Sequence, residues 1–270
     1  MRSLVFLLVA ICSFTCGNEK HIVKNDDGSI KMVFEPLSEN YLQCTKYYSS
    51  GIVQMVARYK GDKLDGVRQL FDSTGLLIEV ADFREGKADG LVKRFKGDQL
   101  LSVYNYTDNV ENGPYQEFYP DGSLKEKGDY YQGNAVGLHY YYDTQGNLIS
   151  IREYKIVKGK SFFNQWWDYG QDSTIKIETS HFLTVEMSGD SVWINLVAPY
   201  FEGNANVIIG DFDSEYNQLL ETLILPMVDG ELVFDKKEYF MSDTLRVVVQ
   251  DYMGKGDDIK IKNIYVEIVP

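Results

Sequence analysis

Residues able to carry out acid–base or metal chemistry are few and scattered in this sequence. The three histidines, His21, His139 and His181, have no second ligand-type residue at the spacing of zinc sites. The sequence contains no P-loop, dinucleotide-binding fingerprint or Gly-x-Ser-x-Gly turn. Glycoside hydrolysis needs two facing carboxylates, and no such pair can be nominated. We therefore expect a protein that is not an enzyme, with no catalytic residue and no cofactor.

One group of carboxylates is a candidate for ion binding. Asp211, Asp213 and Glu215 alternate along the chain, and Asp257 with Asp258 is a possible second source. Alternating oxygens at a strand end can ligate Ca²⁺. Loop carboxylates solvated by water produce the same pattern, and the EF-hand spacing is missing. Both interpretations stay open, and no metal site is assigned.

Aromatic side chains indicate a possible binding surface for a protein or a glycan. Tyr and Trp anchor protein interfaces and also stack on sugars. If they share one exposed face, they form a docking surface for a protein or a glycan. The aromatic run at residues 161–169 can equally pack one domain against another. The binding candidates are Tyr104, Tyr119, Tyr131, Tyr140, Tyr141, Trp166 and Trp167.

All five candidate tyrosines lie within a stretch that repeats about every 24 residues. One aromatic closes each unit, at intervals of 24, 23, 24 and 24 residues. A glycine follows each of the first four aromatics after seven residues, and a second aromatic follows after twelve. A leucine lies six residues before each later closing aromatic. The positions are Tyr59, Phe83, Tyr106, Tyr130, Tyr154; Gly66, Gly90, Gly113, Gly137; Phe71, Phe95, Phe118, Tyr142; and Leu77, Leu100, Leu124, Leu148.

Each unit predicts a β-hairpin. The segments 72–75, 120–122 and 143–146 combine Asp or Pro with Gly, which is turn chemistry. The leucine and the closing aromatic have the same parity, so we expect them on one face of a strand. A single hairpin is marginally stable in water. Stacked hairpins bury a shared face and become stable together.

The pattern Gly-x-x-x-x-(Phe/Tyr)-x-x-x-Gly-x-Leu, closed by an aromatic, resembles the MORN-repeat variant over residues 47–155. The resemblance implies an array of β-hairpin repeats. Bacterial proteins with this repeat are often labelled as antitoxin components of toxin–antitoxin systems. As an alternative function, the resemblance therefore implies an antitoxin or immunity protein that neutralises an envelope-acting toxin.

The N-terminus predicts export. Leu4–Cys12 is an apolar run of the length found in secretory signals, too short to span a membrane. Cys16 follows in a context that resembles the lipobox of Bacteroidetes lipoproteins, which implies lipidation of Cys16. The anchored protein would face the periplasm or lie on the outer-membrane surface. Plain signal cleavage and an uncleaved anchor remain alternatives. Cys44 is then alone, which excludes an intrachain disulfide.

The charge distribution disfavours nucleic acid as a partner. The formal net charge is −13, and residues 161–270 hold seven Lys or Arg against nineteen Asp or Glu, a balance of −12. An acidic surface repels phosphate backbones and anionic lipid headgroups. Contact with a membrane is therefore expected through the lipid anchor alone.

The C-terminal region predicts a second kind of β structure. Seven or eight short Val/Ile/Leu-rich segments, bounded by Gly, Asp or Asn, suggest an immunoglobulin-like β-sandwich. The predicted fold is all-β, with hairpin repeats followed by this sandwich. The expected divisions are a signal peptide at 1–16, a tether at 17–40 with an edge strand at 30–34, repeats at 41–160 and the sandwich at 161–270. The predicted function is a non-enzymatic cell-envelope lipoprotein with a binding or scaffold role.

Overall fold

A computed structural model describes residues 19–38, 40–188, 191–198, 205–235, 244–253 and 260–269. These residues form strands, turns and bends, and the described part of the chain contains no helix. None of the described segments can therefore cross a membrane as a helix. The predicted signal peptide with Cys16, and the pair Asp257 and Asp258, lie outside these residues. The all-β prediction is confirmed for the residues described.

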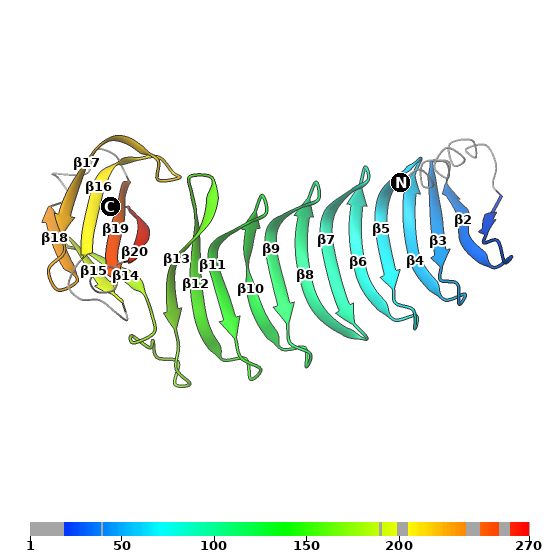
Figure 1. Cartoon of the computed structure of the whole chain (residues 1–270), viewed down its shortest axis with the longest axis horizontal. Helices are drawn as coiled ribbons and strands as arrows, with labels where there is room; N and C mark the ends of the chain where they lie inside the picture. The colour runs from blue at the N-terminus through cyan, green and yellow to red at the C-terminus, as the bar shows by residue number, and fades with distance from the viewer. Residues whose placement is uncertain are drawn as a thin grey trace. The chain divides into compact units, whose positions relative to one another are not determined.

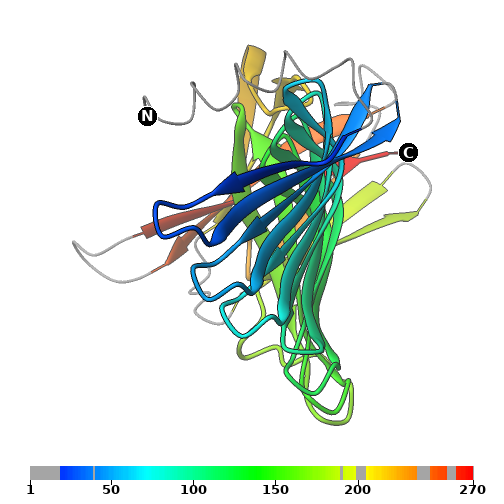
Figure 2. The same cartoon turned by 90° about the vertical axis from the view of Figure 1, so that its right-hand side faces the viewer.

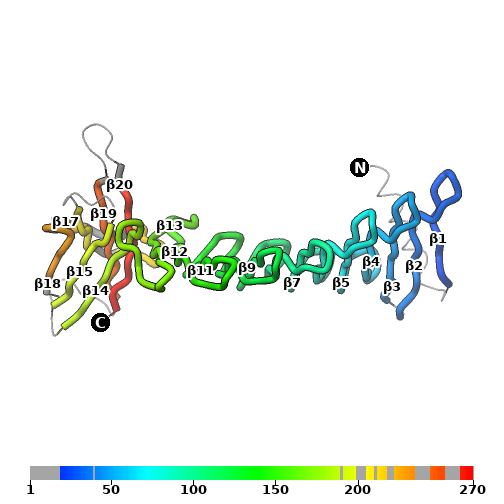
Figure 3. The backbone as a smooth tube through the Cα atoms, turned by 90° about the horizontal axis from the view of Figure 1, so that it is seen from below, coloured from blue at the N-terminus to red at the C-terminus, as the bar shows by residue number. Residues whose placement is uncertain are grey.

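The first sheet has thirteen strands, and their order in the sheet is their order in the sequence (Figure 1). Neighbours pair antiparallel within β1–β9 and within β11–β13. Between β2 and β9 successive turns lie at opposite ends of the strands (Figure 1), and the backbone passes from each strand to its neighbour in sequence order (Figure 3). The strands are β1 His21–Lys24, β2 Ile30–Ser38, β3 Tyr41–Tyr47, β4 Val53–Lys60, β5 Lys63–Phe71, β6 Leu77–Arg84, β7 Lys87–Lys96, β8 Gln99–Thr107, β9 Val110–Phe118, β10 Leu124–Tyr131, β11 Asn134–Tyr142, β12 Leu148–Val157 and β13 Lys160–Asp168.

The chain divides into two compact units. Unit 1 comprises the residues up to Lys125 together with Tyr130–Gly133. Unit 2 comprises Glu126–Asp129 and the residues from Asn134 onward. The expected tether at 17–40 contains β1 and β2, so the sheet begins at His21. The sheet also continues past residue 160, through β13.

The repeated glycines in unit 1 lie within β-bulges of their own strands. Ala81 pairs with Val92 and Phe83 pairs with Ala88, so three β7 residues, Asp89 to Leu91, lie opposite the single β6 residue Asp82. Gly90 lies against it with φ of 126°, and a Cβ added there would lie 2.9 Å from the Asp82 Cβ. Gly66 against Arg58 has the same arrangement, with φ of 118° and a nearest atom at 2.8 Å. Glycine is thus required for both its backbone conformation and its missing side chain.

Replacing Gly90 with alanine should lower the free energy of unfolding by about 1–3 kcal/mol, because the substitution forces a strained φ and a clash with Asp82. Gly97→Ala is the matched control, since Gly97 has φ of 66° and no atom within 4 Å of the added Cβ. Urea denaturation of both variants measures the difference. Equal losses for Gly90→Ala and Gly97→Ala would contradict the steric part of this explanation.

Bulges also correct the predicted faces of the repeat. The closing aromatic lies opposite a glycine, as in the pair Phe83 and Gly66. Leu77 and Glu79 pair with the adjacent β5 residues Phe71 and Leu70, so Ile78 is an extra residue in β6. The alternation of side chains is therefore interrupted between Leu77 and Phe83. The expectation that parity alone places leucine and aromatic on one face is wrong, because it assumes an unbroken ladder.

Two further sheets in unit 2 share one buried core. One sheet has the order β14-β15-β18 and the other has the order β17-β16-β19-β20. Along β15, buried residues alternate with partly exposed ones, and Val192 and Ile194 are fully buried. They join Val207 of β16 and Val247 of β19 in one hydrophobic cluster, so both sheets contribute to it. The strands are β14 Phe182–Ser188, β15 Ser191–Val197, β16 Ala205–Phe212, β17 Gln218–Pro226, β18 Glu231–Asp235, β19 Leu245–Met253 and β20 Lys260–Ile268.

Candidate functional site

Tyr104, the first binding candidate, is engaged within unit 1. Its ring stacks on Tyr115, with 5.1 Å between centroids, and lies at a tilt to Tyr130 at 6.1 Å. Its hydroxyl donates a hydrogen bond to Glu117 at 2.7 Å. Burial, with this bond to a carboxylate, raises the pKa of the Tyr104 phenol. Tyr104 therefore contributes to an internal cluster of three tyrosines.

Tyr119 and Tyr131 lie near turns. The backbone N–H of Tyr119 donates to Ser123, and its carbonyl accepts from Gly122, so Tyr119 begins the turn after β9. Tyr131 ends β10 and is 55% exposed, the most exposed of the tyrosine candidates.

The four candidates of unit 2 divide between opposite faces of the sheet. Tyr140 pairs with Ile151, which pairs with Trp167. Tyr141 pairs with Ser150, on the face that also carries Arg152 and Trp166. We call the side of the sheet that carries Tyr140, Ile151 and Trp167 the Ile151 face. The opposite side, which carries Tyr141, Arg152 and Trp166, is the Arg152 face. The condition of one shared face is therefore not met by these four residues, because neighbours along a strand point to opposite sides.

The Arg152 face is filled by contacts among its own rings. Trp166 stacks against Phe163 at 5.1 Å and against His181 at 4.8 Å. The Lys262 ammonium lies 4.8 Å from the Phe163 ring and donates a hydrogen bond to the Phe163 carbonyl. Burial lowers the pKa of Lys262 to about 8. This face of β13 is therefore used for packing within unit 2.

The Ile151 face exposes a group of apolar side chains. Tyr140, Ile151 and Trp167 form a half-buried row across β11, β12 and β13. Leu138, two residues before Tyr140, and Ile149, two residues before Ile151, are 41% and 42% exposed. Exposed apolar groups of this kind mark interaction sites. We define the Ile151 patch as Leu138, Tyr140, Ile149, Ile151, Trp167 and Tyr169.

One cation and two further apolar residues border the Ile151 patch. The Lys127 ammonium lies 5.0 Å from the centre of the Tyr140 ring. Tyr169 donates its backbone N–H to Ile149 and forms an isolated bridge with Ile175. Ile175 and Ile177 are 40% and 62% exposed. Apolar surface thus continues from the sheet onto the segment that follows β13.

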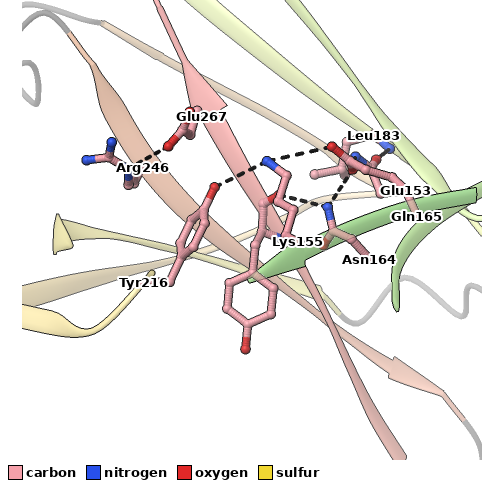
Figure 4. Close-up of polar contacts among 9 residues, drawn as sticks. Glu153, Lys155, Asn164, Gln165, Leu183, Tyr216, Arg246 and Glu267 are labelled. Atoms are coloured by element: carbon pink, nitrogen blue, oxygen red, sulfur yellow. Dashed lines mark hydrogen bonds and ion pairs between the residues drawn. The ribbon is translucent and has the colours of Figure 1, made fainter. Parts of the chain in front are cut away.

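The outer edge of β13 is closed by side-chain amides (Figure 4) together with a backbone bridge between Trp166 and His181. Asn164 is the extra residue of a bulge against β12 and is fully buried. Its Oδ1 accepts the Tyr265 backbone N–H at 2.8 Å, and its Nδ2 donates to the Tyr265 carbonyl at 2.9 Å and to Glu153 at 2.6 Å. The Asn164 amide thus provides the hydrogen bonds that a neighbouring strand would supply.

Gln165 extends this closure to the next strand. Its Oε1 accepts the Leu183 backbone N–H at 2.7 Å, and its Nε2 donates to Glu153 at 2.7 Å. Lys155 lies 3.7 Å from the same carboxylate and 3.4 Å from the Tyr216 hydroxyl (Figure 4). Of the two interpretations of residues 161–169, these contacts support packing against the C-terminal strands.

His181 and Asp251 form a buried pair that the sequence did not reveal. The His181 Nε2 lies 3.1 Å from an Asp251 carboxylate oxygen, and both side chains are fully buried. The His181 Nδ1 and the other Asp251 oxygen have no hydrogen-bond partner among the described residues. Seventy residues separate the two in sequence, so no local motif could have indicated the pair.

Among the calcium candidates, Asp213 caps its own loop. Its carboxylate accepts the backbone N–H of Glu215 at 2.8 Å and that of Asn217 at 2.9 Å. A hydrogen bond from the Asn217 side chain, together with these backbone hydrogen bonds, lowers the pKa of Asp213. The Asp211 side chain lies outside the described ones. Where side chains are described, no three metal-ligating groups gather at one point.

Cys44 packs as a small apolar residue. It is 2% exposed, and burial raises the pKa of its thiol to about 11. The thiol is therefore protonated at neutral pH and weakly nucleophilic.

Comparison with known families supports the repeat. A family model described as the MORN repeat variant matches residues 111–132, which include the repeated Gly113, Phe118, Leu124 and Tyr130. No curated protein matches the chain. The match covers β9, β10 and the turn between them, which is one hairpin of the predicted kind. The antitoxin label and the lipoprotein type stay predictions from the resemblance.

Proposed function

We propose that this protein is a non-enzymatic lipoprotein of the bacterial cell envelope that binds a protein partner through the Ile151 patch. Export would depend on residues 1–16, and lipid on Cys16 would anchor the chain. The observation that supports binding most is the patch itself, which combines half-buried Tyr140 and Trp167 with exposed Leu138 and Ile149. Aromatic anchors surrounded by aliphatic side chains are typical of protein interfaces.

A protein fits the patch better than a glycan does. Sugars stack on the open faces of aromatic rings, whereas the two rings here are half-buried and flanked by aliphatic side chains. We also propose that the seven C-terminal strands form an immunoglobulin-like sandwich. The two sheets with a shared core support this proposal. The sandwich would cap the repeat sheet, in line with the contacts that Asn164 and Gln165 make.

Leu138→Lys and Ile149→Lys should each reduce capture of the partner by about tenfold or more, because a charge is placed in an apolar interface. Photo-crosslinking in intact cells, followed by quantification of the attached protein, measures capture. Both positions are exposed, so the substitutions should leave the fold intact. Thermal denaturation checks this.

Leu91→Lys is the matched control. Leu91 follows Gly90 as Leu138 follows Gly137, and the two leucines are 38% and 41% exposed. Capture should persist in Leu91→Lys. Undiminished capture by both patch variants would refute the patch as the docking site. Attachment of a saccharide in place of a protein would refute the assigned class of partner.

A further inference from the structure

The first strand of the sheet lies close in sequence to the proposed anchor. β1 begins at His21, five residues after Cys16. An extended chain spans at most ~3.6 Å per residue, so His21 stays within roughly 18 Å of Cys16. This limit holds for any conformation of the residues between them. A lipid on Cys16 would therefore keep β1 near the surface of the bilayer.

The β1–β2 hairpin exposes apolar side chains at this end of the sheet. Ile22 of β1 is 44% exposed, and Ile30 and Leu37 of β2 are 41% and 55% exposed. The hairpin is the dark blue element in Figure 2. Ile22 and Lys24 lie on one side of β1, and Lys24 pairs with Ile30, which places the two isoleucines near each other. An end strand with exposed apolar residues is normally covered or charged.

The charge of this hairpin favours apolar contact over electrostatic attraction. Residues 19–38 contain three lysines and four acidic residues, a balance of −1. Lys20 is also paired with Glu35 at 2.8 Å. Anionic headgroups would gain little from such a surface. A zwitterionic bilayer is the membrane that fits it.

We propose that the β1–β2 hairpin contacts the headgroup region of a zwitterionic phospholipid bilayer through Ile22 and Ile30. This inference depends on the lipidation of Cys16 in the proposed function. Apolar side chains at an interface enter the headgroup and acyl boundary by about 5–10 Å, which the short connection to Cys16 permits. The sheet would then begin at the membrane surface, and its later strands would be carried away from the anchor in sequence order.

The test uses the full-length lipidated protein in phosphatidylcholine vesicles. An environment-sensitive fluorophore is attached to Ile22→Cys, Ile30→Cys or the control Val67→Cys, which is 46% exposed in β5. Native Cys44 is buried and its thiol protonated, so labelling favours the new cysteine. Quenching by spin labels on the headgroups should be about twofold or more stronger at positions 22 and 30 than at position 67. The difference should persist at high salt.

Two different failures can be told apart by flotation with the vesicles. If the wild type and Cys16→Ser both fail to float, the lipid anchor is wrong and the membrane contact fails with it. If the wild type floats and Cys16→Ser does not, but quenching is equal at positions 22 and 67, the hairpin contact alone is wrong. Flotation with strong quenching at 22 and 30 supports both proposals.

Discussion

Asp251→Ala is expected to lower the free energy of unfolding by about 3–5 kcal/mol, because removing one member of a buried pair leaves the other without compensation. His181 would lose the carboxylate that lies 3.1 Å from its Nε2. Its Nδ1 already has no partner within the described structure. Urea denaturation followed by tryptophan fluorescence is a direct measurement, since the Trp166 ring stacks on His181.

The double variant Asp251→Leu with His181→Phe controls for loss of packing. Both substitutions replace buried polar groups by apolar groups of similar volume, which removes the unpaired polar atoms altogether. Phenylalanine also preserves a ring against Trp166. The double variant should recover most of the stability lost in Asp251→Ala. If Asp251→Ala loses less than about 1 kcal/mol of unfolding free energy, the buried pair stabilises the fold no more than a surface ion pair does.

Asn164→Ala is expected to lower the free energy of unfolding by about 2–5 kcal/mol, because each buried polar group left unpaired costs about 1–3 kcal/mol. The substitution leaves both the N–H and the C=O of Tyr265 without their bonds to the Asn164 amide. The variant should also show faster amide hydrogen exchange in β13 and β20. Denaturant titration and hydrogen exchange by mass spectrometry measure the two effects.

Lys155→Ala provides a comparison within the same group of contacts. Lys155 lies 3.7 Å from Glu153 and 3.4 Å from the Tyr216 hydroxyl, which are long distances for polar contacts. Its removal should cost less than about 1 kcal/mol. If Asn164→Ala and Lys155→Ala lose the same stability, the closure of the β13 edge does not depend on the Asn164 amide.

The repeat could be predicted because its information is local and periodic. Gly90 and Gly113 each follow an aromatic residue at the same spacing in the sequence. The Asp and Gly of residues 72–75 are typical of a turn. Strand positions follow from these marks. Outside the repeat, the edge strand predicted at 30–34 is part of β2, which extends to Ser38 and buries Val33 to 4% exposure, whereas the four-residue strand β1 at His21–Lys24 was not predicted.

The faces of the sheet and its closed edge could not be predicted, since both depend on bulges and distant contacts. An extra residue such as Ile78 or Asn164 breaks the parity count without a signature in the sequence. The bond between Asn164 and Tyr265 joins residues 101 positions apart. Tyr140 and Tyr141 looked equivalent in sequence, and only the register placed them on opposite sides.

The bulge that contains each repeated glycine of unit 1 has a consequence for how this chain can change in size. In unit 1, Gly66, Gly90 and Gly113 each meet the residue before a closing aromatic. An in-frame duplication of one unit would therefore meet the same neighbours on either side as the original. Gain or loss of whole units is the mutational route that disturbs least, whereas a one-residue insertion would misalign every later hairpin.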